Sequence, residues 1–393
     1  MKTKSPNPRT LRARPRLEIL EDRTAPAVNI LFDGANLTIT GDPGTTLTIT
    51  QNPADVTVMD DFGNYGPYAV TGNITASLTN AIAARTITYD LGANTTGGSV
   101  AISTGNVLGG NTVALTGAGT IGGNFSVTGG NGSESFDLQE ATIRGSVILN
   151  LRGADDTVNV GSVNPATIDG NLTGTGVNSF ELFDNSIVGG HVTLNTTGEI
   201  ASATTYFFDG SAGNQSSVGG NVFVSTGVVT GAGTFVFQGR IAGNLVAGLN
   251  TAPTSNTFTI DSSADVLGSV TIRGGNSSDN VTLAAGSDVL GNIAMIGGIG
   301  SDTLTLNGNV LGSSIIFSGG NGSDTLQVGA TATMGSARLF GYLGNGVDTY
   351  RADVAATLFS AYIDYGAGAD IFDPTDMGVT GLPYRYRITH RNK

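Results

Sequence analysis

Residues 266–328 read VLGSVTIRGGNSSDNVTLAAGSDVLGNIAMIGGIGSDTLTLNGNVLGSSIIFSGGNGSDTLQV, and this stretch decides the fold. The same two-part pattern occurs in it three times. Each copy has an apolar residue two places before a Gly, a short alternating strand, a Gly-rich turn, an Asp and a second alternating strand. Alternation of apolar and polar residues indicates half-buried β-strands, and Gly suits tight corners with positive φ.

The pattern recurs at intervals of about two dozen residues. Successive starts at Val266, Val289, Val310, Met334 and Leu358 lie 21 to 24 residues apart. Earlier copies begin at Ile121, Ile143, Ile168, Val188, Val218 and Ile241. Such a unit cannot bury its own apolar side, so the copies must stack. We therefore predict an all-β protein, a right-handed parallel β-helix (β-solenoid) with coils of about 22–24 residues and capping strands at both ends.

Composition and repeat spacing divide the chain into four expected parts. Residues 1–27 form a basic, targeting-like segment, residues 28–98 an irregular β region that caps the N-terminal end, residues 99–373 the solenoid, and residues 374–393 a C-terminal cap or tail. Within the N-terminal cap, two alternating strands flank a Gly-Asp-Pro-Gly turn. These strands, residues 37–40 and 47–50, are predicted to pair as a hairpin.

Composition also excludes several classes of protein. The chain has no Cys, which excludes disulfides, thiolate metal sites and a cysteine nucleophile. Between the two basic ends, 28 acidic residues face seven Arg and no Lys, a balance of −21. Such a body should repel nucleic acid and anionic lipid. No apolar run is long enough for a transmembrane helix.

The N-terminal segment contains a recognisable motif. Residues 17–27 read LEILEDRTAPA. This string resembles the "LExLEDR…PA" segment that precedes the β-rich, repetitive bodies of many surface or secreted proteins of planctomycete bacteria. The resemblance implies that the protein is exported and works at the cell surface or outside the cell.

Two of the Gly-rich turns carry a longer motif. Residues 297–305 and 319–327 both fit Gly-Gly-x-Gly-x-Asp-x-apolar-x. This pattern resembles the RTX repeats of secreted bacterial proteins, in which carboxylate and backbone oxygens of successive loops hold Ca²⁺. The resemblance implies candidate ligands in Asp302 and Asp324 and in the carbonyls of Gly298, Gly300, Gly320 and Gly322; partial copies of the motif add Asp279, Asp348 and Asp370.

Stacking in register would place these aspartates in one row. Neighbouring carboxylates about 5 Å apart repel by about 1 kcal/mol per pair in water, and more strongly near a protein surface. A bound cation would relieve the repulsion. Splaying of the side chains into solvent, or capping by each Asp of its own turn, would relieve it as well. A calcium site and plain Asx-type turns are therefore both open interpretations of this row.

Candidate catalytic residues are few. His191 precedes a predicted strand as a surface residue of a coil, and no Gly-x-Ser-x-Gly nucleophile motif accompanies it. Cleavage of an acidic polysaccharide needs clustered carboxylates beside a basic side chain. Arg144 and Arg152, near Asp155 and Asp156, are the one such grouping considered. We predict no catalytic residues and no enzymatic activity.

Asn follows the repeat Gly in several coils. We predict that these residues form a partial ladder, with side-chain amides bonding up and down the stack: Asn124, Asn171, Asn221, Asn244 and Asn292.

These features favour a non-enzymatic structural or adhesive protein of the cell surface or secreted fraction. One alternative is an RTX-like calcium-binding β-roll protein, for which Ca²⁺ is the only cofactor candidate. The other is a polysaccharide-binding or polysaccharide-cleaving β-helix. Expected partners are cell-surface polysaccharide or other surface proteins.

Overall fold

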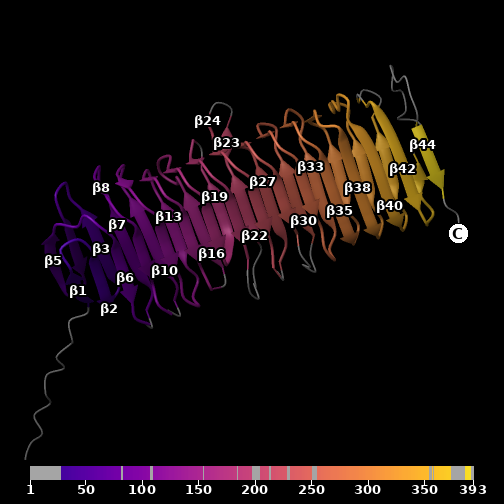
Figure 1. The fold of residues 1–393 in the computed structure, drawn as a ribbon. Coiled ribbons are helices and arrows are strands. Elements are labelled where there is room, and N and C mark those ends of the chain that lie inside the picture. The colour runs from indigo at the N-terminus through magenta and orange to yellow at the C-terminus, as the bar shows by residue number, and fades with distance from the viewer. Residues whose placement is uncertain are drawn as a thin grey trace, which may run out of the picture.

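The computed structural model describes residues 28–80, 83–106, 109–153, 155–183, 185–196, 204–211, 214–227, 231–249, 255–353, 356, 358–372 and 386–390. In these residues the chain winds into a rod with three long sheets along its length (Figure 1). The predicted all-β solenoid is confirmed. The targeting-like segment 1–27 and most of the expected tail 374–393 lie outside the described residues.

Three sheets form the walls of the rod. Sheet 1 contains β1 (Val28–Phe32), β2 (Leu37–Gly41), β6 (Ile74–Leu78), β9 (Val100–Ser103), β12 (Phe125–Thr128), β15 (Val147–Asn150), β18 (Leu172–Thr175), β21 (Val192–Asn195), β26 (Val222–Ser225), β29 (Leu245–Gly248), β32 (Val270–Arg273), β35 (Ile293–Ile299), β38 (Ser314–Asn321), β40 (Arg338–Asn345), β42 (Ser360–Gly366) and β44 (Tyr386–His390). Sheet 2 contains β5 (Gly63–Tyr68), β4 (Val56–Asp60), β3 (Thr46–Gln51), β7 (Arg85–Asp90), β10 (Asn111–Thr116), β13 (Ser135–Leu138), β16 (Asp156–Val160), β19 (Val177–Leu182), β22 (Thr204–Phe208), β27 (Gly233–Phe237), β30 (Asn256–Ile260), β33 (Asp279–Leu283), β36 (Thr303–Leu306), β39 (Thr325–Val328), β41 (Thr349–Ala352) and β43 (Ile371–Phe372). Sheet 3 consists of two-residue strands: β8 (Thr95–Thr96), β11 (Thr120–Ile121), β14 (Thr142–Ile143), β17 (Thr167–Ile168), β20 (Ile187–Val188), β25 (Ser217–Val218), β28 (Arg240–Ile241), β31 (Asp265–Val266), β34 (Asp288–Val289) and β37 (Asn309–Val310).

From β7 to β38, each coil visits the sheets in the order 2, 3, 1. For example, β33 leads to β34 and then to β35, and the next coil begins with β36. Equivalent strands of successive coils pair in parallel, as when Val281 pairs with Leu304 and Ile293 with Ile315. The middle of the rod has a longer coil, in which a small antiparallel pair, β23 (Gly210–Ser211) and β24 (Asn214–Gln215), protrudes before β25 (Figure 1).

Alternation places one face of every strand in the core. In β32, Val270 and Ile272 are buried and Arg273 is exposed. Because strand side chains alternate between the two faces, the three walls direct their apolar residues into one continuous interior. Burial of each large apolar side chain contributes about 1.5–3 kcal/mol relative to exposure. Stacking therefore supplies the core that a single coil lacks.

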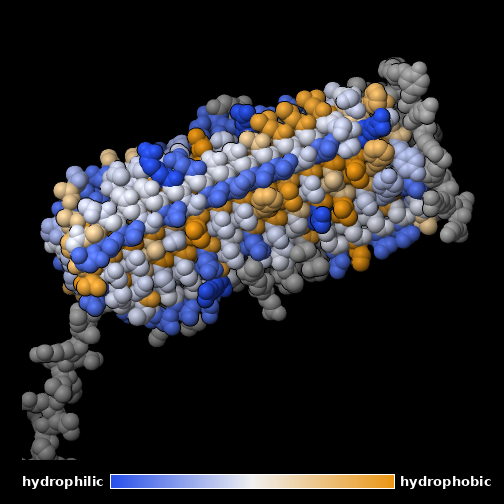
Figure 2. Space-filling model, viewed as in Figure 1, coloured by the Kyte–Doolittle hydropathy of each residue, from blue (hydrophilic) through white to orange (hydrophobic). Residues whose placement is uncertain are grey.

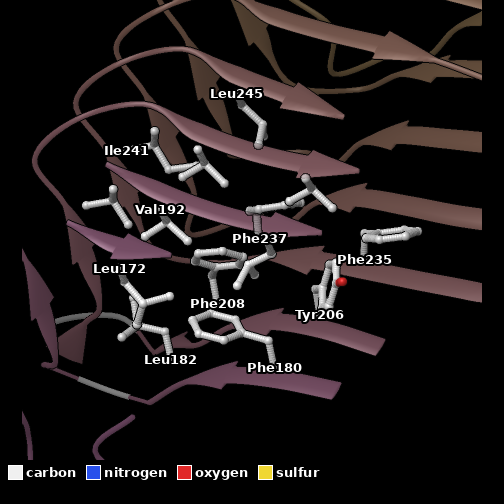
Figure 3. Packing of buried hydrophobic residues seen from close by; sticks show 14 of the residues in the cluster. Leu172, Phe180, Leu182, Val192, Tyr206, Phe208, Phe235, Phe237, Ile241 and Leu245 are labelled. Atoms are coloured by element: carbon white, nitrogen blue, oxygen red, sulfur yellow. The ribbon is translucent and has the colours of Figure 1, made fainter. Parts of the chain in front are cut away.

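Aromatic rings fill the middle of this core. Phe208 and Phe237 stack between successive coils with ring centroids 4.7 Å apart, and Phe180 lies 5.2 Å from Phe208 on the other side. Tyr206 and Phe235 form a neighbouring pair at 5.4 Å. Figure 3 shows these rings pointing toward aliphatic side chains from the other two walls. Such ring pairs contribute about 0.5–1.5 kcal/mol beyond their burial.

The predicted hairpin of residues 37–40 and 47–50 is wrong. These strands lie in different sheets: β2 pairs with β1 and β6 in sheet 1, whereas β3 pairs with β4 and β7 in sheet 2. The intervening turn is a corner of the solenoid. Both strands bury their apolar residues completely, since they face the interior from two walls instead of lying side by side in one sheet.

Antiparallel strands end the two long sheets at the N-terminal end. β1 covers the edge of β2, and β4 and β5 cover the edge of β3. Parallel stacking begins directly behind them, where β2 meets β6 and β3 meets β7. Covering the open edge limits pairing with other chains.

The outer surface is predominantly polar. Figure 2 shows a hydrophilic stripe along the long axis of the rod, with hydrophobic patches beside it. Throughout the described part of the chain, there is no helix with the length and apolar character needed to span a membrane.

Candidate functional site: a buried polar column

A column of polar residues runs inside the rod where each strand of sheet 2 begins. Its members occupy equivalent positions in successive coils, and nearly all are completely buried. In order along the rod they are Arg85, Asn111, Glu134, Asp156, Asn178, Thr204, Gly233, Asn256, Asp279, Asp302, Asp324, Asp348 and Asp370. The five aspartates predicted to form a row are thus brought together at the C-terminal end of this column.

Four of the five aspartates bind the backbone of the coil before them, whereas Asp279 accepts from the Asn256 side chain of that coil. Oδ1 of Asp302 accepts the Asp279 backbone N–H at 2.8 Å, and Oδ1 of Asp324 accepts the Asp302 N–H at 2.8 Å. Asp348 and Asp370 continue the series at 2.9 and 3.1 Å. The side chains therefore neither splay into solvent nor cap only their own turns. They connect coils.

The Gly-Gly-x-Gly part of the motif makes room for this arrangement. A Cβ on Gly297 would overlap Oδ2 of Asp302, and one on Gly319 would overlap Oδ2 of Asp324. Gly298, the second Gly, has φ +118°, and its Cβ would collide with the carbonyl of Gly275 in the preceding coil. Close stacking of the coils is therefore a physical reason for the glycines in these two turns.

The second carboxylate oxygen of each central aspartate lacks a donor. Oδ2 of Asp302, Asp324 and Asp348 is buried and accepts no hydrogen bond. Burial raises the pKa of Asp302 to about 7, and repulsion by Asp279 and Asp324 adds to the effect. Burial likewise raises the pKa of Asp348 to about 6, again with repulsion from its acidic neighbours. The pKa values of Asp279 and Asp324 are also raised by burial.

A second acidic pair lies nearer the N-terminal end of the column. Oδ1 of Asp156 accepts the Glu134 backbone N–H at 2.7 Å, and Glu134 accepts the Gly130 N–H at 3.0 Å. Burial raises the pKa of Glu134 to about 7 and also raises that of Asp156. Asp156, which the sequence groups with Arg144 and Arg152, thus belongs to this column.

Uncharged residues join the two acidic stretches. Asn256 Oδ1 accepts the Gly233 N–H at 3.0 Å, and its Nδ2 donates to Asp279 Oδ1 at 2.7 Å. Asn178 Oδ1 accepts the Asp156 N–H at 3.2 Å. Neither amide is predicted from the sequence, because no Gly-Gly-x-Gly motif precedes Asn178 or Asn256. Register counted back from Asp279 could have located Asn256.

Arg85 begins the column with the opposite charge. Its guanidinium is completely buried, donates to the carbonyls of Thr79 and Thr104 at 2.5 and 3.1 Å, and pairs with Asp42 at 2.8 Å. It therefore ties several N-terminal turns together.

The chemistry that this column supports is limited by its burial. Among the described residues, no group of three or more His, Asp or Glu side chains is arranged to hold a metal ion. Gly298 and Gly320, whose carbonyls are candidate ligands, pair with each other in sheet 1. A cation here would need the unpaired Oδ2 atoms together with backbone oxygens.

A second ladder follows the corner between sheets 3 and 1. Oδ1 of Asn124 accepts the Ser146 N–H at 2.8 Å, and Oδ1 of Asn221 accepts the Asn244 N–H at 2.8 Å. The predicted Asn ladder is confirmed, but its bonds run from side chain to backbone. Other links in it come from Ser99, Ser146, Ser269 and His191.

His191 is exposed, as predicted, and also belongs to this ladder. Its Nδ1 accepts the Asn221 backbone N–H at 2.8 Å. Two members of the predicted acidic and basic grouping have other partners. Arg144 pairs with Asp169 at 3.9 Å, whereas Asp156 is buried in the column.

The outer face of sheet 1 has a shallow trough of about 380 Å³. Phe223 and Val246 line one side, and Asn195, Ser225 and Arg273 line the other. Gly248 lies between Ser225 and Arg273 and leaves the floor open.

Comparison of the chain with protein-family models, with curated proteins and with solved structures finds no match.

Proposed function

We propose that this protein is a non-enzymatic structural or adhesive rod. The proposal rests on one observation, which is that the buried polar side chains are engaged in hydrogen bonds between coils. The aspartates and amides of the buried column bond to the backbone of neighbouring coils. These groups hold the coils together. A general acid or base has to reach its substrate, and groups buried in this way do not.

Work outside the cell is part of this proposal. Its support is the LEILEDRTAPA segment at residues 17–27 and the strongly acidic body. A body of net charge −21 remains soluble and resists self-association through mutual repulsion.

The adhesive partner that we propose is a surface polysaccharide. The trough on sheet 1 offers the exposed ring of Phe223 beside the guanidinium of Arg273 and the polar side chains of Asn195 and Ser225. An aromatic face suits the apolar side of a sugar ring, and the guanidinium suits a carboxylate or sulfate group.

Fractionation of native cells tests the location. Immunoblotting is expected to find the protein in the surface or secreted fraction, and recovery in the cytoplasm would refute export. For adhesion, binding of the full chain to extracted cell-surface glycans is compared with that of Phe223→Ala and of Arg273→Ala. Equal binding by all three proteins would remove the trough from the proposal.

A calcium-dependent stack is the second candidate, favoured by the unpaired Oδ2 atoms of Asp302, Asp324 and Asp348. Circular dichroism of the chelator-treated chain, followed during calcium addition, tests it. A gain of β-structure or a large rise in melting temperature would support this candidate. A metal-free chain that is already fully β and melts unchanged with calcium would eliminate it.

A further inference from the structure

The outer face of sheet 1 changes in character along the rod. From β2 to β21 its outward side chains are nearly all Thr, Ser, Asn or Ala, and Ile148 is the exception. From β26 to β42, toward the C-terminal end of the rod, apolar and aromatic side chains are common in the same positions (Figure 1). Because strand side chains alternate between two faces, these residues point away from the core and expose apolar surface.

Cross-strand pairing aligns some of these side chains in a first row along the rod axis. The row leads from Phe223 and Val246 in the trough to Ile316, Phe340 and Tyr362. Phe223 is 39% exposed and Ile316 is 38% exposed. Since neighbouring strands lie about 4.8 Å apart, the row forms a narrow strip that crosses the strands.

A second row runs beside the first, two residues further along each strand. It contains Ser225, Arg273, Ile296 and Tyr342. Ile296 and Tyr342 are 46% and 44% exposed. The ring of Tyr342 lies 6.0 Å, centroid to centroid, from the ring of Tyr362 in the first row. The trough and this aromatic pair therefore lie at the two ends of one continuous face.

This face lacks acidic side chains although the rod is strongly acidic. From β21 to β40, the outward residues of sheet 1 include no Asp or Glu, and the charged ones are Arg273 and Arg338. A body of net charge −21 repels a second copy of itself and anionic lipid. A basic partner would find no acid here. The charge pattern thus favours a mainly neutral partner with isolated negative groups.

The side chains on the face suit a sugar chain better than an apolar partner. Exposed rings such as Phe223 and Tyr342 lie among hydroxyl and amide groups, including those of Asn195 and Ser225. A sugar has an apolar ring face that packs on aromatic rings and hydroxyl groups that form hydrogen bonds. A lipid or an apolar protein surface would bury the polar side chains without hydrogen bonds, which is unfavourable.

We propose that one polysaccharide chain binds along this face, parallel to the rod axis, from the trough to the Tyr342–Tyr362 pair. The inference rests on the proposed function, because it extends the same glycan site. Arg273 donates to the carboxylate of a uronic acid, and the rings pack on neutral sugars. Six strand spacings of about 4.8 Å separate Phe223 from Tyr362, a length of about 29 Å. An extended glycan advances by close to one strand spacing per sugar, so a chain of about seven sugars covers the face.

Chain length distinguishes this proposal from binding in the trough alone. Cell-surface glycan that binds the full-length protein is partly hydrolysed, and its fragments are separated by size. Fragments of about seven sugars should compete with the intact glycan at least about tenfold better, per mole, than fragments of about three sugars, because only the longer ones reach both ends. Equal competition would overturn the proposal and leave the trough as a site. Failure of the intact glycan to bind would instead refute the adhesive function itself.

Removal of the aromatic pair tests the far end of the face. Tyr342→Ala/Tyr362→Ala should weaken binding of the long fragments at least about fivefold and reduce their advantage over the short ones. Tyr342→Phe/Tyr362→Phe keeps both rings and should retain most of the binding. Ile148→Ala, at an exposed position on the N-terminal half of the same face, is the matched control and should bind like the wild type. Circular dichroism and melting verify that each variant is folded.

Reduction of the uronate carboxyl groups to alcohols tests the role of Arg273. Reduced long fragments should bind the wild type more weakly than untreated ones, whereas Arg273→Ala should bind both alike. Two results would overturn the proposal. One is a folded Tyr342→Ala/Tyr362→Ala variant that binds the long fragments as tightly as the wild type does. The other is a wild type that binds reduced and untreated fragments equally well.

Discussion

At the scale of single residues, short polar side chains connect one coil to another. Asp302 and Asn221 perform the same task in different columns: each side-chain oxygen accepts a backbone N–H from a neighbouring coil. His191 performs it with a ring nitrogen. The geometry needed is one acceptor at a fixed distance from the backbone, which Asp, Asn, Ser and His can all provide.

This equivalence makes His191 replaceable by Asn. His191→Asn should keep the bond to the Asn221 N–H, since Asn221 and Asn244 supply that acceptor in the next coils. His191→Ala removes the acceptor and should lower the free energy of unfolding by about 0.5–1.5 kcal/mol. Urea denaturation measures both variants. Equal losses would show that the ladder bond contributes nothing at this coil.

The glycines beside the aspartates allow a second prediction. Gly319→Ala places a methyl group on Asp324 Oδ2 and should destabilise the rod by about 1–3 kcal/mol, as overpacking does. Gly248→Ala is the matched control, because its Cβ would lie 3.9 Å from Ser225 Oγ in ordinary contact. Equal melting temperatures of the two variants would contradict the claim that Gly319 is needed to make room for Asp324.

At the scale of elements, the N-terminal turns are joined by one buried cation. Arg85 at the start of β7 donates to the Thr79 and Thr104 carbonyls on successive turns and pairs with Asp42 in the corner between β2 and β3. Loss of the guanidinium would take this donor from the buried carbonyl of Thr104. A buried acceptor without a donor lowers the free energy of unfolding by more than an average hydrogen bond contributes to it.

Arg85→Met tests this connection while keeping most of the side-chain volume. We expect the free energy of unfolding to fall by about 1–3 kcal/mol, the cost of leaving a buried acceptor without its donor, because the partner Asp42 is itself more than half exposed. Arg144→Met is the control, because Arg144 and Asp169 form an exposed pair at 3.9 Å, worth about 0–1 kcal/mol. A comparable loss in both variants by denaturant titration would argue against a special role for Arg85.

At the scale of the whole molecule, stacking determines the shape. Each of the two long sheets has sixteen strands among the described residues. At a strand spacing of about 4.8 Å, they extend for about 70 Å along the rod axis. Every apolar strand face is directed into the same interior, so growth adds length and leaves the cross-section nearly constant.

Electron microscopy of the purified chain tests this shape. We expect rods about 70 Å long, with one preferred long axis. Compact, equiaxial particles would contradict a continuous stack. So would separate globular modules joined by linkers.

The repeat and its alternating pattern are enough to predict the class of fold and the row of aspartates. Alternation identified the strands, and a pattern such as Val289-Leu-Gly recurring every two dozen residues required them to stack. Register then follows from the repeat, which is why the repeat spacing alone aligns Asp279, Asp302 and Asp324.

The burial of the aspartate side chains and the sheet to which each N-terminal strand belongs depend on tertiary contacts. A four-residue turn is compatible with a hairpin and with a corner of the solenoid. What places β2 and β3 in different sheets is their pairing with β6 and β7 of the next coil. Repeat spacing likewise aligned the aspartates without saying whether they face solvent or the interior. Their burial depends on the room that Gly297 and Gly319 leave for the carboxylates by lacking a Cβ, and on the N–H groups of another coil. Contacts between distant segments set that environment, and no local pattern encodes it.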